Sequence, residues 1–407
     1  MHYLFIGFLL LGITAALARA LLGDPQALAD TMQAMFGAAN LAVQVSIGLI
    51  GILTLWTGLF RLAERSGLAD WVSAKVMPLL GRLMPESRNN PAAMAPVTMN
   101  LSANMLGLDN AATPLGLKAM QALQQGNSTP DTATNSQIMF LVLNTSSVTL
   151  IPVTVLMYRA QQGAADPADI YLPMLMATTA STFVGVWLTA RIQRINLLNP
   201  VVMTAAGLWL LMLLVLGSVA LMLPQGAAAT LSSAIGNGIL LAVVALFLLL
   251  AHRAKVDAYS TFIDGAKEGF ELAVRLIPYL VAMLVAIAVL REGGVLDWLL
   301  DGIRHLAIWF GWDTRFVDAL PVALLKPLSG SGARAMMLEV MHTHGVDSLA
   351  GRMAAVMQGS TETTFYVLAV YFGSVGVVRM RHALFCGLVS DFAGLSTAIL
   401  ATYLFFG

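Results

Sequence analysis

Short polar side chains gather between Asn100 and Lys118, where Gly and Pro interrupt an otherwise apolar sequence. Amides and hydroxyls of this kind can coordinate an ion or hydrogen-bond a solute, and glycine lets a backbone approach closely. The same residue types are also found in ordinary polar loops, where Asn and Ser side chains cap helices. The candidate ligands of this stretch are Asn100, Ser102, Asn104, Asp109, Asn110 and Thr113.

A second candidate site lies at the glycine-rich stretch 329–334, next to a predicted helix over 333–341. Backbone N–H groups at a helix start favour an anion, and Arg334 adds a positive charge. The alternative is a glycine hinge whose Arg334 pairs with Glu362 or Glu339. No Gly-Lys-Ser/Thr follows, so a phosphate loop for nucleotide hydrolysis is excluded. The candidate residues here are Ser329, Gly330, Ser331 and Arg334.

A third group of polar residues interrupts two strongly apolar segments, at 144–149 and 358–364. Several adjacent polar side chains are too costly to expose to lipid, so they should face protein or water. Hydrogen bonding between helices by Ser and Thr is the alternative. We assign substrate contacts to Asn144, Thr145, Ser360, Thr361 and Thr364. We assign ion or proton coupling to the acidic residues Asp109, Glu362 and Asp391.

The sequence carries no catalytic signature that would indicate an enzyme. Its histidines lie mostly near loops, and the spacing of His342 and His344 does not suit a zinc site on a helix. The Gly-Ser-Gly around Ser331 is not the Gly-x-Ser-x-Gly turn of serine hydrolases. Cys386 is the single cysteine, which excludes an intrachain disulfide. We therefore expect no enzyme activity, no metal site and no cofactor.

The composition is that of a membrane protein. Hydrophobic residues make up 58% of the 407 residues and charged residues only 11%, against roughly 25% charged in soluble proteins. Lys plus Arg and Asp plus Glu number 22 each, so the net charge gives no reason to expect a nucleic-acid partner. Several runs reach the roughly 20 apolar residues that cross a bilayer core. We predict an all-α integral membrane protein with full spans at 3–22, 41–62, 138–158, 170–190, 199–222, 231–251, 272–291, 353–376 and 383–406.

The two halves of the chain resemble each other in the same order, which indicates an internal duplication. Residues 66–72 match 293–299, residues 144–146 match 359–361, and residues 181–185 match 390–394. In the last match, neutral Thr182 stands opposite Asp391, so the two sites are not equivalent. The predicted organisation is a first repeat at 1–195, a linking transmembrane helix at 196–228 and a second repeat at 229–407.

Basic residues near the ends of spans favour the cytoplasm. They predict cytoplasmic loops at 63–69, 191–198, 252–262 and 377–382, a cytoplasmic N-terminus and an external C-terminus. Equivalent spans then run in opposite directions, and inverted repeats of this kind are typical of secondary transporters. A duplicated scaffold without transport is the alternative. The parity of the spans makes regions 70–125 and 297–345 re-entrant helical hairpins, whose broken backbone must line a cavity or be buried in protein.

The stretch 100–118 resembles the signature of spore maturation protein A, whereas 327–333 and 359–373 resemble spore maturation protein B. The chain resembles a fusion of the two, with the A-like unit first. Both belong to the nucleoside-recognition, or Gate, family, which includes parts of concentrative nucleoside transporters and of the ferrous-iron transporter. The resemblance implies a Gate-type fold, membrane transport or gating, and a place in the bacterial cytoplasmic (inner) membrane. It does not establish a nucleoside substrate.

Together these patterns predict a secondary-type transporter that moves a small polar solute, anionic, zwitterionic or nucleoside-like, through one cavity between the repeats. A lipid flippase or scramblase is one alternative, and a gate or scaffold subunit linked to spore-maturation-like processes is another. The expected partners are membrane lipid, the solute and a coupling Na⁺ or H⁺ ion, and a homo-oligomer is left open. The tips of both hairpins are expected to meet near the bilayer midplane.

Overall fold

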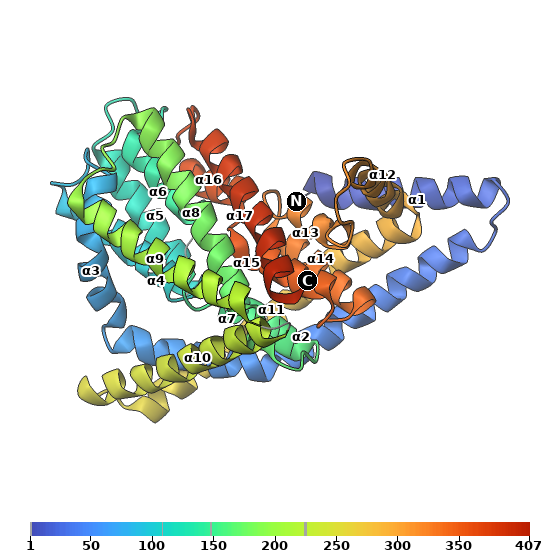
Figure 1. Cartoon of the computed structure of the whole chain (residues 1–407), viewed down its shortest axis with the longest axis horizontal. Helices are drawn as coiled ribbons and strands as arrows, with labels where there is room; N and C mark the ends of the chain where they lie inside the picture. The colour runs from blue at the N-terminus through green and yellow to red at the C-terminus, as the bar shows by residue number, and fades with distance from the viewer. Residues whose placement is uncertain (1, 108, 147–148, 224–225) are drawn as a thin grey trace.

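The computed structural model describes residues 2–107, 109–146, 149–223 and 226–407. These residues form helices joined by short loops, and one isolated β-bridge joins Thr132 to Arg379 among them. The first half contains α1 (His2–Leu21), α2 (Ala27–Arg65), α3 (Leu68–Leu83), α4 (Pro91–Met105), α5 (Asp109–Gln125), α6 (Asn135–Ser146), α7 (Val153–Gln161), the 3-10 turn η1 (Pro167–Ile170) and α8 (Tyr171–Gln193). After α9 (Pro200–Met222), the second half contains α10 (Ala227–Arg253), α11 (Ala258–Glu292), α12 (Val295–Trp309), η2 (Val317–Ala319), α13 (Leu320–Leu325), α14 (Gly330–His344), α15 (Leu349–Ser360), α16 (Thr364–Gly373) and α17 (Ala383–Phe406) (Figure 1).

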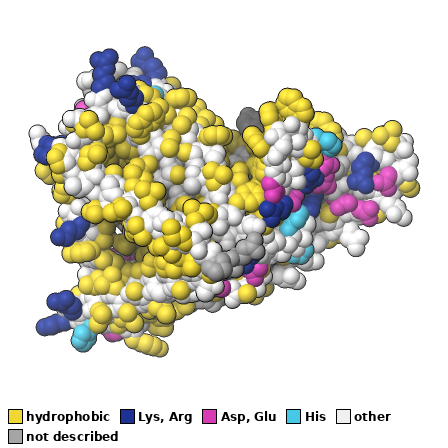
Figure 2. All heavy atoms as spheres, viewed as in Figure 1, with side chains coloured by type: hydrophobic (Ala, Val, Ile, Leu, Met, Phe, Trp, Pro, Cys, Tyr) yellow, Lys and Arg dark blue, Asp and Glu magenta, His cyan; other side chains and the backbone are white. Residues whose placement is uncertain are grey.

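Six helices of the described chain are long and apolar enough to cross a membrane: α2, the η1–α8 unit, α9, α10, α11 and α17. Only 6% of the apolar window of α9 is buried in the protein, so this helix has the surface expected to face lipid. Hydrophobic side chains dominate the body of the face shown in Figure 2, and most Lys and Arg side chains lie toward its margins. The all-α integral membrane fold predicted from composition is confirmed.

Two of the predicted full spans are not continuous helices. The span expected at 138–158 is divided into α6 and α7, and the span expected at 353–376 is divided into α15 and α16. At the second break, Thr361 and Thr363 have extended backbone conformations. At the first break, Pro152 directly precedes α7. Its ring clashes with a preceding helical turn and it has no backbone N–H to donate, so one continuous helix cannot run through this position. The prediction of unbroken helices was therefore wrong at both polar interruptions.

The start of α2 was also placed wrongly. The second span was expected to begin at residue 41, but the helix begins at Ala27 and continues for 39 residues. The extra turns are rich in Ala and Met, which are strong helix formers. The counterpart α11 is similarly long, and these two helices pack against each other more extensively than any other pair of described helices.

The two halves pack reciprocally, as a two-fold axis between them requires. Helix α1 packs on α11 while α10 packs on α2, and α6 packs on α17 while α15 packs on α8. The axis passes near Ser181 and Ser390, whose hydroxyl oxygens are 2.9 Å apart. These two serines are each other's counterparts in the matched stretches 181–185 and 390–394, so the structure agrees with the sequence alignment of the halves.

The counterpart segments run antiparallel. Ala133 N, just before α6, donates to the carbonyl of Arg379, which follows α16 (3.0 Å). At the opposite end, Arg159 of α7 donates to the carbonyl of Val346, which precedes α15 (3.1 Å). The start of one broken helix pair thus meets the end of the other. This is the arrangement expected for inverted repeats.

Both amphipathic helices begin in the same way. Gly67 precedes α3 with φ 75°, and Gly294 precedes α12 with φ 79°. Only glycine adopts this left-handed conformation without strain, so it can turn the chain sharply out of a long helix. The matched stretches 66–72 and 293–299 therefore encode the same corner in each half.

Candidate functional site

Each hairpin tip docks on the broken helix of its own half. Leu150 N donates to the Met105 carbonyl at the end of α4, and Phe365 N donates to the Pro327 carbonyl between α13 and α14, both at 3.0 Å. Leu150 and Phe365 occupy equivalent positions six residues beyond the matched pair 144 and 359. Backbone groups freed by the helix breaks therefore find partners on the hairpins, as buried backbone must.

The two breaks also contact each other. Glu362 N, in the break between α15 and α16, donates to the Thr145 carbonyl at the end of α6 (2.7 Å). The Ser329 hydroxyl accepts from Gly332 N at 2.8 Å and caps α14. Four irregular segments from both halves thus meet at one place.

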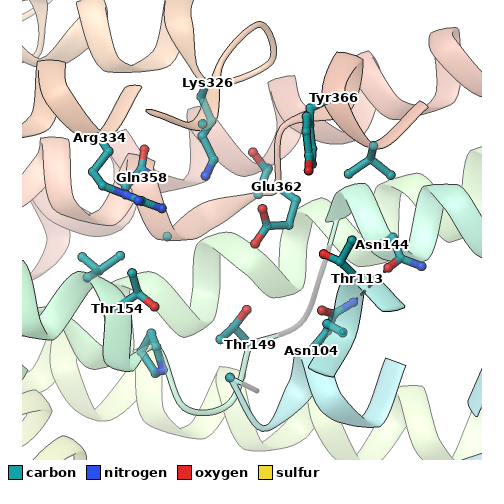
Figure 3. A pocket seen from close by; sticks show the side chains of 18 of the residues that line it. Asn104, Thr113, Asn144, Thr149, Thr154, Lys326, Arg334, Gln358, Glu362 and Tyr366 are labelled. Carbon is teal, nitrogen blue, oxygen red and sulfur yellow. Dashed lines mark hydrogen bonds between the residues drawn. The ribbon is translucent and has the colours of Figure 1, made fainter. Parts of the chain in front are cut away.

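A pocket opens where these segments meet (Figure 3). Its cavity volume is about 270 Å³, just below the range of about 300–1000 Å³ that is typical of pockets for small molecules. The walls come from both hairpins, from both broken helices and from the start of α7. In this conformation the pocket is of the size expected for a small solute rather than a large one.

Two basic side chains and one acidic side chain line the pocket. Lys326 comes from the tip before α14, Arg334 from the first turns of α14, and Glu362 from the second break. Lys326 is 3% exposed, whereas Glu362 reaches open solvent. In Figure 3 the Lys326 ammonium and the Glu362 carboxylate both point into the space between the ribbons. The described lining therefore carries one more positive than negative charge.

Amide and hydroxyl groups form the opposite wall. Asn104 Nδ2 donates to Asn144 Oδ1 at 2.9 Å, and Asn144 Nδ2 donates to the Phe140 carbonyl at 2.9 Å. These bonds fix both amides, one on the first hairpin and one on α6. Thr149, within the first break, and Thr154, at the start of α7, add hydroxyls. The wall can hydrogen-bond a polar solute without carrying a charge of its own.

Seven of the residues predicted from the sequence line the pocket: Asn104, Thr113, Asn144, Gly330, Arg334, Thr361 and Glu362. Others lie behind the wall and bond locally: Asn100 to the Ala112 carbonyl, Ser102 to Thr98, Thr145 to Val142, Ser329 to Gly332 and Ser360 to Met357. Ser331 is half-buried, and Thr364 and Asp391 are buried; none of the three is part of the lining. The side chains of Asp109 and Asn110 are outside the described part of the chain.

Sequence reasoning missed Lys326, Gln358 and Tyr366 as lining residues. Lys326 could have been found because a lysine within a stretch of low charge at a hairpin tip needs water or a partner. Gln358 begins the polar stretch 358–364, but only later residues of that stretch were assigned to the site. Tyr366 gave no signal, because an aromatic residue in an apolar helix is indistinguishable from a packing residue.

A buried ionic cluster joins the two halves at one end of the broken helices. We call Arg159, Asp169, Asp347 and Arg352 the Arg159 cluster. Arg159 is fully buried and donates to Asp169 Oδ1 at 2.9 Å and to Asp347 Oδ1 at 3.0 Å. Arg352 donates to Asp169 Oδ2 at 2.8 Å, and its guanidinium lies 4.6 Å from the centre of the Phe406 ring. The cluster closes the contact between the α7–η1 loop and the α14–α15 loop.

An exposed contact joins the halves at the other end. Arg379 forms an ion pair with Asp131 at 2.5 Å, and Val378 N donates to the Asp131 carbonyl at 2.9 Å. Hydrogen bonds from the Thr132 and Arg379 side chains lower the pKa of Asp131. We call this contact the Asp131–Arg379 closure. The pocket therefore lies between two inter-repeat closures, one buried and ionic, the other exposed and built largely from backbone.

Known proteins share this sequence pattern. The family model described as nucleoside recognition, or Gate, matches residues 46–161 and 273–378, one stretch in each half. The chain is similar to spore maturation protein B of Bacillus subtilis (strain 168), with 44% identity over 165 residues, which is 40% of this chain and 91% of that protein. It is also similar to spore maturation protein A of the same organism, with 42% identity over 154 residues, which is 38% of this chain and 79% of that protein. Each relative matches about two-fifths of the chain, as expected for a fusion of two such units.

Proposed function

Since the chain belongs to the Gate nucleoside-recognition family of membrane proteins, we propose that it is a secondary-type transporter. It moves a small polar solute with an anionic group through the pocket between its halves. The observation that carries the proposal is the set of charged side chains at the meeting point of two broken helices and two hairpins. Broken helices at membrane depth supply binding groups in many secondary transporters.

The charge of the pocket favours an anionic group on the solute. Lys326 and Arg334 both come from the second hairpin, at α13–α14. The planar guanidinium of Arg334 is suited to binding a carboxylate or phosphate. Glu362 can accept hydrogen bonds from an amine or hydroxyl at the other end of the same solute. A zwitterion or a nucleoside-like molecule with an acidic group satisfies both ends.

The two closures supply the moving parts of the proposed cycle. Each joins a loop of one half to a loop of the other, so the pocket can open on either side by breaking one contact at a time. The Arg159 cluster buries charge and is costly to break, whereas exposed ion pairs contribute little. The Asp131–Arg379 closure is therefore expected to open first.

Uptake into proteoliposomes tests the proposal. The purified protein is offered labelled amino acids, carboxylates, nucleosides and nucleoside monophosphates, and a fluorescent lipid in the same vesicles reports lipid scrambling. We expect uptake of an anionic or zwitterionic class. Arg334→Gln should raise the half-saturation concentration for uptake of this solute about 10- to 100-fold, as expected for the loss of a charge-assisted hydrogen bond. Arg88→Gln, at an exposed arginine away from the pocket, is the matched control.

Two outcomes would overturn the proposal. Lipid movement without solute uptake would identify a flippase or scramblase instead. No movement of solute or lipid, from vesicles in which the protein is folded, would favour a gate or scaffold subunit.

A further inference from the structure

Asp391 is a buried acid that the pocket does not use. It lies within α17, is 1% exposed, and does not line the cavity. Neither carboxylate oxygen makes a hydrogen bond of normal geometry within the described chain. An ionised carboxylate in such a place is strongly unfavourable unless a cation or a proton neutralises it. The residue therefore needs either a positively charged partner or a proton.

Two threonines stand against Asp391. Gly387 and Gly394 share its face of α17, one turn before and one turn after. A Cβ at Gly387 would lie 2.8 Å from Thr364 Cγ2, and a Cβ at Gly394 would lie 2.8 Å from Thr361 Cγ2. The two glycines thus let both threonines approach the helix on either side of the acid. Both threonine hydroxyls are buried and act on the Asp391 carboxylate as hydrogen-bond donors, although none of these oxygens makes a hydrogen bond of normal geometry within the described chain.

The charged groups that face Asp391 have opposite signs. Lys326 and Glu362 both act on it electrostatically, and both line the pocket. No group of three or more His, Cys, Asp or Glu side chains is assembled anywhere in the described chain. One carboxylate and two hydroxyls are also fewer than the six to eight oxygens that calcium requires. A multivalent metal therefore does not fit, whereas a proton needs only the carboxylate.

The counterpart position in the first half indicates which ligand belongs here. Thr182, which matches Asp391, donates its hydroxyl to the Ser146 carbonyl at the end of α6 (3.3 Å). The position thus holds an O–H donor beside the end of a broken helix. A carboxylate donates no hydrogen bond, but a protonated carboxylic acid does. Protonation would give Asp391 the donor that its counterpart already has.

We propose that Asp391 is a proton-binding site that couples proton movement to the pocket through Thr361. The Thr361 hydroxyl can accept a proton on one side while it donates on the other, and Thr361 lines the cavity. Because Thr182 is neutral, the second half alone carries an acid at this position. The coupling rests on the proposed transport function, whereas the proton site itself does not.

Infrared spectroscopy tests the site without any transport. Purified protein at neutral pH should show the C=O band of a protonated carboxyl group, and this band should be missing in Asp391→Asn. The control Asp313→Asn, at a loop carboxylate bonded to Arg315, should keep it. Asp391→Thr, which installs the residue of the first half, provides a second variant if the amide disturbs folding. A wild-type spectrum without a band that depends on Asp391 would overturn the proposal.

Sodium and coupling are separated by two further measurements. A rise of thermal stability with Na⁺ in the wild type, absent in Asp391→Asn, would replace the proton with a sodium ion and overturn the proposal. In vesicles that take up solute, Asp391→Asn should reduce uptake driven by a pH gradient to the level without a gradient. Unchanged gradient-driven uptake would exclude coupling. A band that depends on Asp391 in a protein that moves no solute would instead refute only the proposed function.

Discussion

Arg159→Gln should destabilise the protein more than any other single change at an inter-repeat contact. The guanidinium is fully buried and bonds Asp169 at 2.9 Å, Asp347 at 3.0 Å and the Val346 carbonyl at 3.1 Å. Removing one member of a buried ionic group costs about 3–5 kcal/mol, because the remaining charge stays buried without its partner. Asp347 is 32% exposed and Arg352 still bonds Asp169, so the lower end applies. We expect a loss of about 3 kcal/mol, roughly 100-fold in the folded-to-unfolded ratio.

The free energy of unfolding can be measured by titration with sodium dodecyl sulfate in mixed micelles. Arg379→Gln is the matched control, because its ion pair joins the same two halves but is exposed to solvent. The double variant Arg159→Gln/Asp347→Asn should lose less than the sum of the two single changes, since the partners act as one unit. An Arg159→Gln protein no less stable than Arg379→Gln would refute the claim that the buried cluster holds the halves together.

Three further changes test separate parts of the fold. Gly294→Ala, which forces a side chain onto φ 79°, should cost about 1–2 kcal/mol in the same titration. Asp313→Asn should make the melting temperature fall less steeply at acidic pH, because hydrogen bonds from Arg315 lower the pKa of Asp313 to about 2. The stabilisation from this carboxylate is present above about pH 4 and is lost as the pH falls toward 2. Gly394→Leu should overpack the contact with the second helix break and cost about 1–3 kcal/mol in melting experiments, whereas Gly207→Ala, with open space around it, should be neutral.

The sequence was most informative where a feature occurs twice. The match of 181–185 with 390–394 placed Ser181 opposite Ser390, and in the structure these serines touch across the axis between the halves. The hairpins could be predicted because an even number of crossings was required at both places. Because the chain is duplicated, an inference from one half can be checked against its counterpart in the other half, which is not possible for a polar stretch that occurs once.

The breaks in the helices could not be read from hydropathy. An average over some twenty residues treats Thr361 and Thr363 as tolerable polar residues in an apolar span. Whether a helix stops there depends on partners for the backbone, and these come from the hairpin carbonyls of Met105 and Pro327, far away in sequence. The same limit hid the buried role of Arg159, whose acidic partner Asp347 lies in the other half.

The most direct test of the central claim is whether the pocket can be reached from both sides of the membrane. Thr113→Cys places a thiol on the pocket wall, in a Cys386→Ser background that removes the natural cysteine. A membrane-impermeant maleimide is applied to right-side-out and to inside-out vesicles. The account predicts labelling from both sides, with a transported solute slowing the reaction in each case. Labelling from one side alone, under every solute and pH condition, would contradict transport through this pocket.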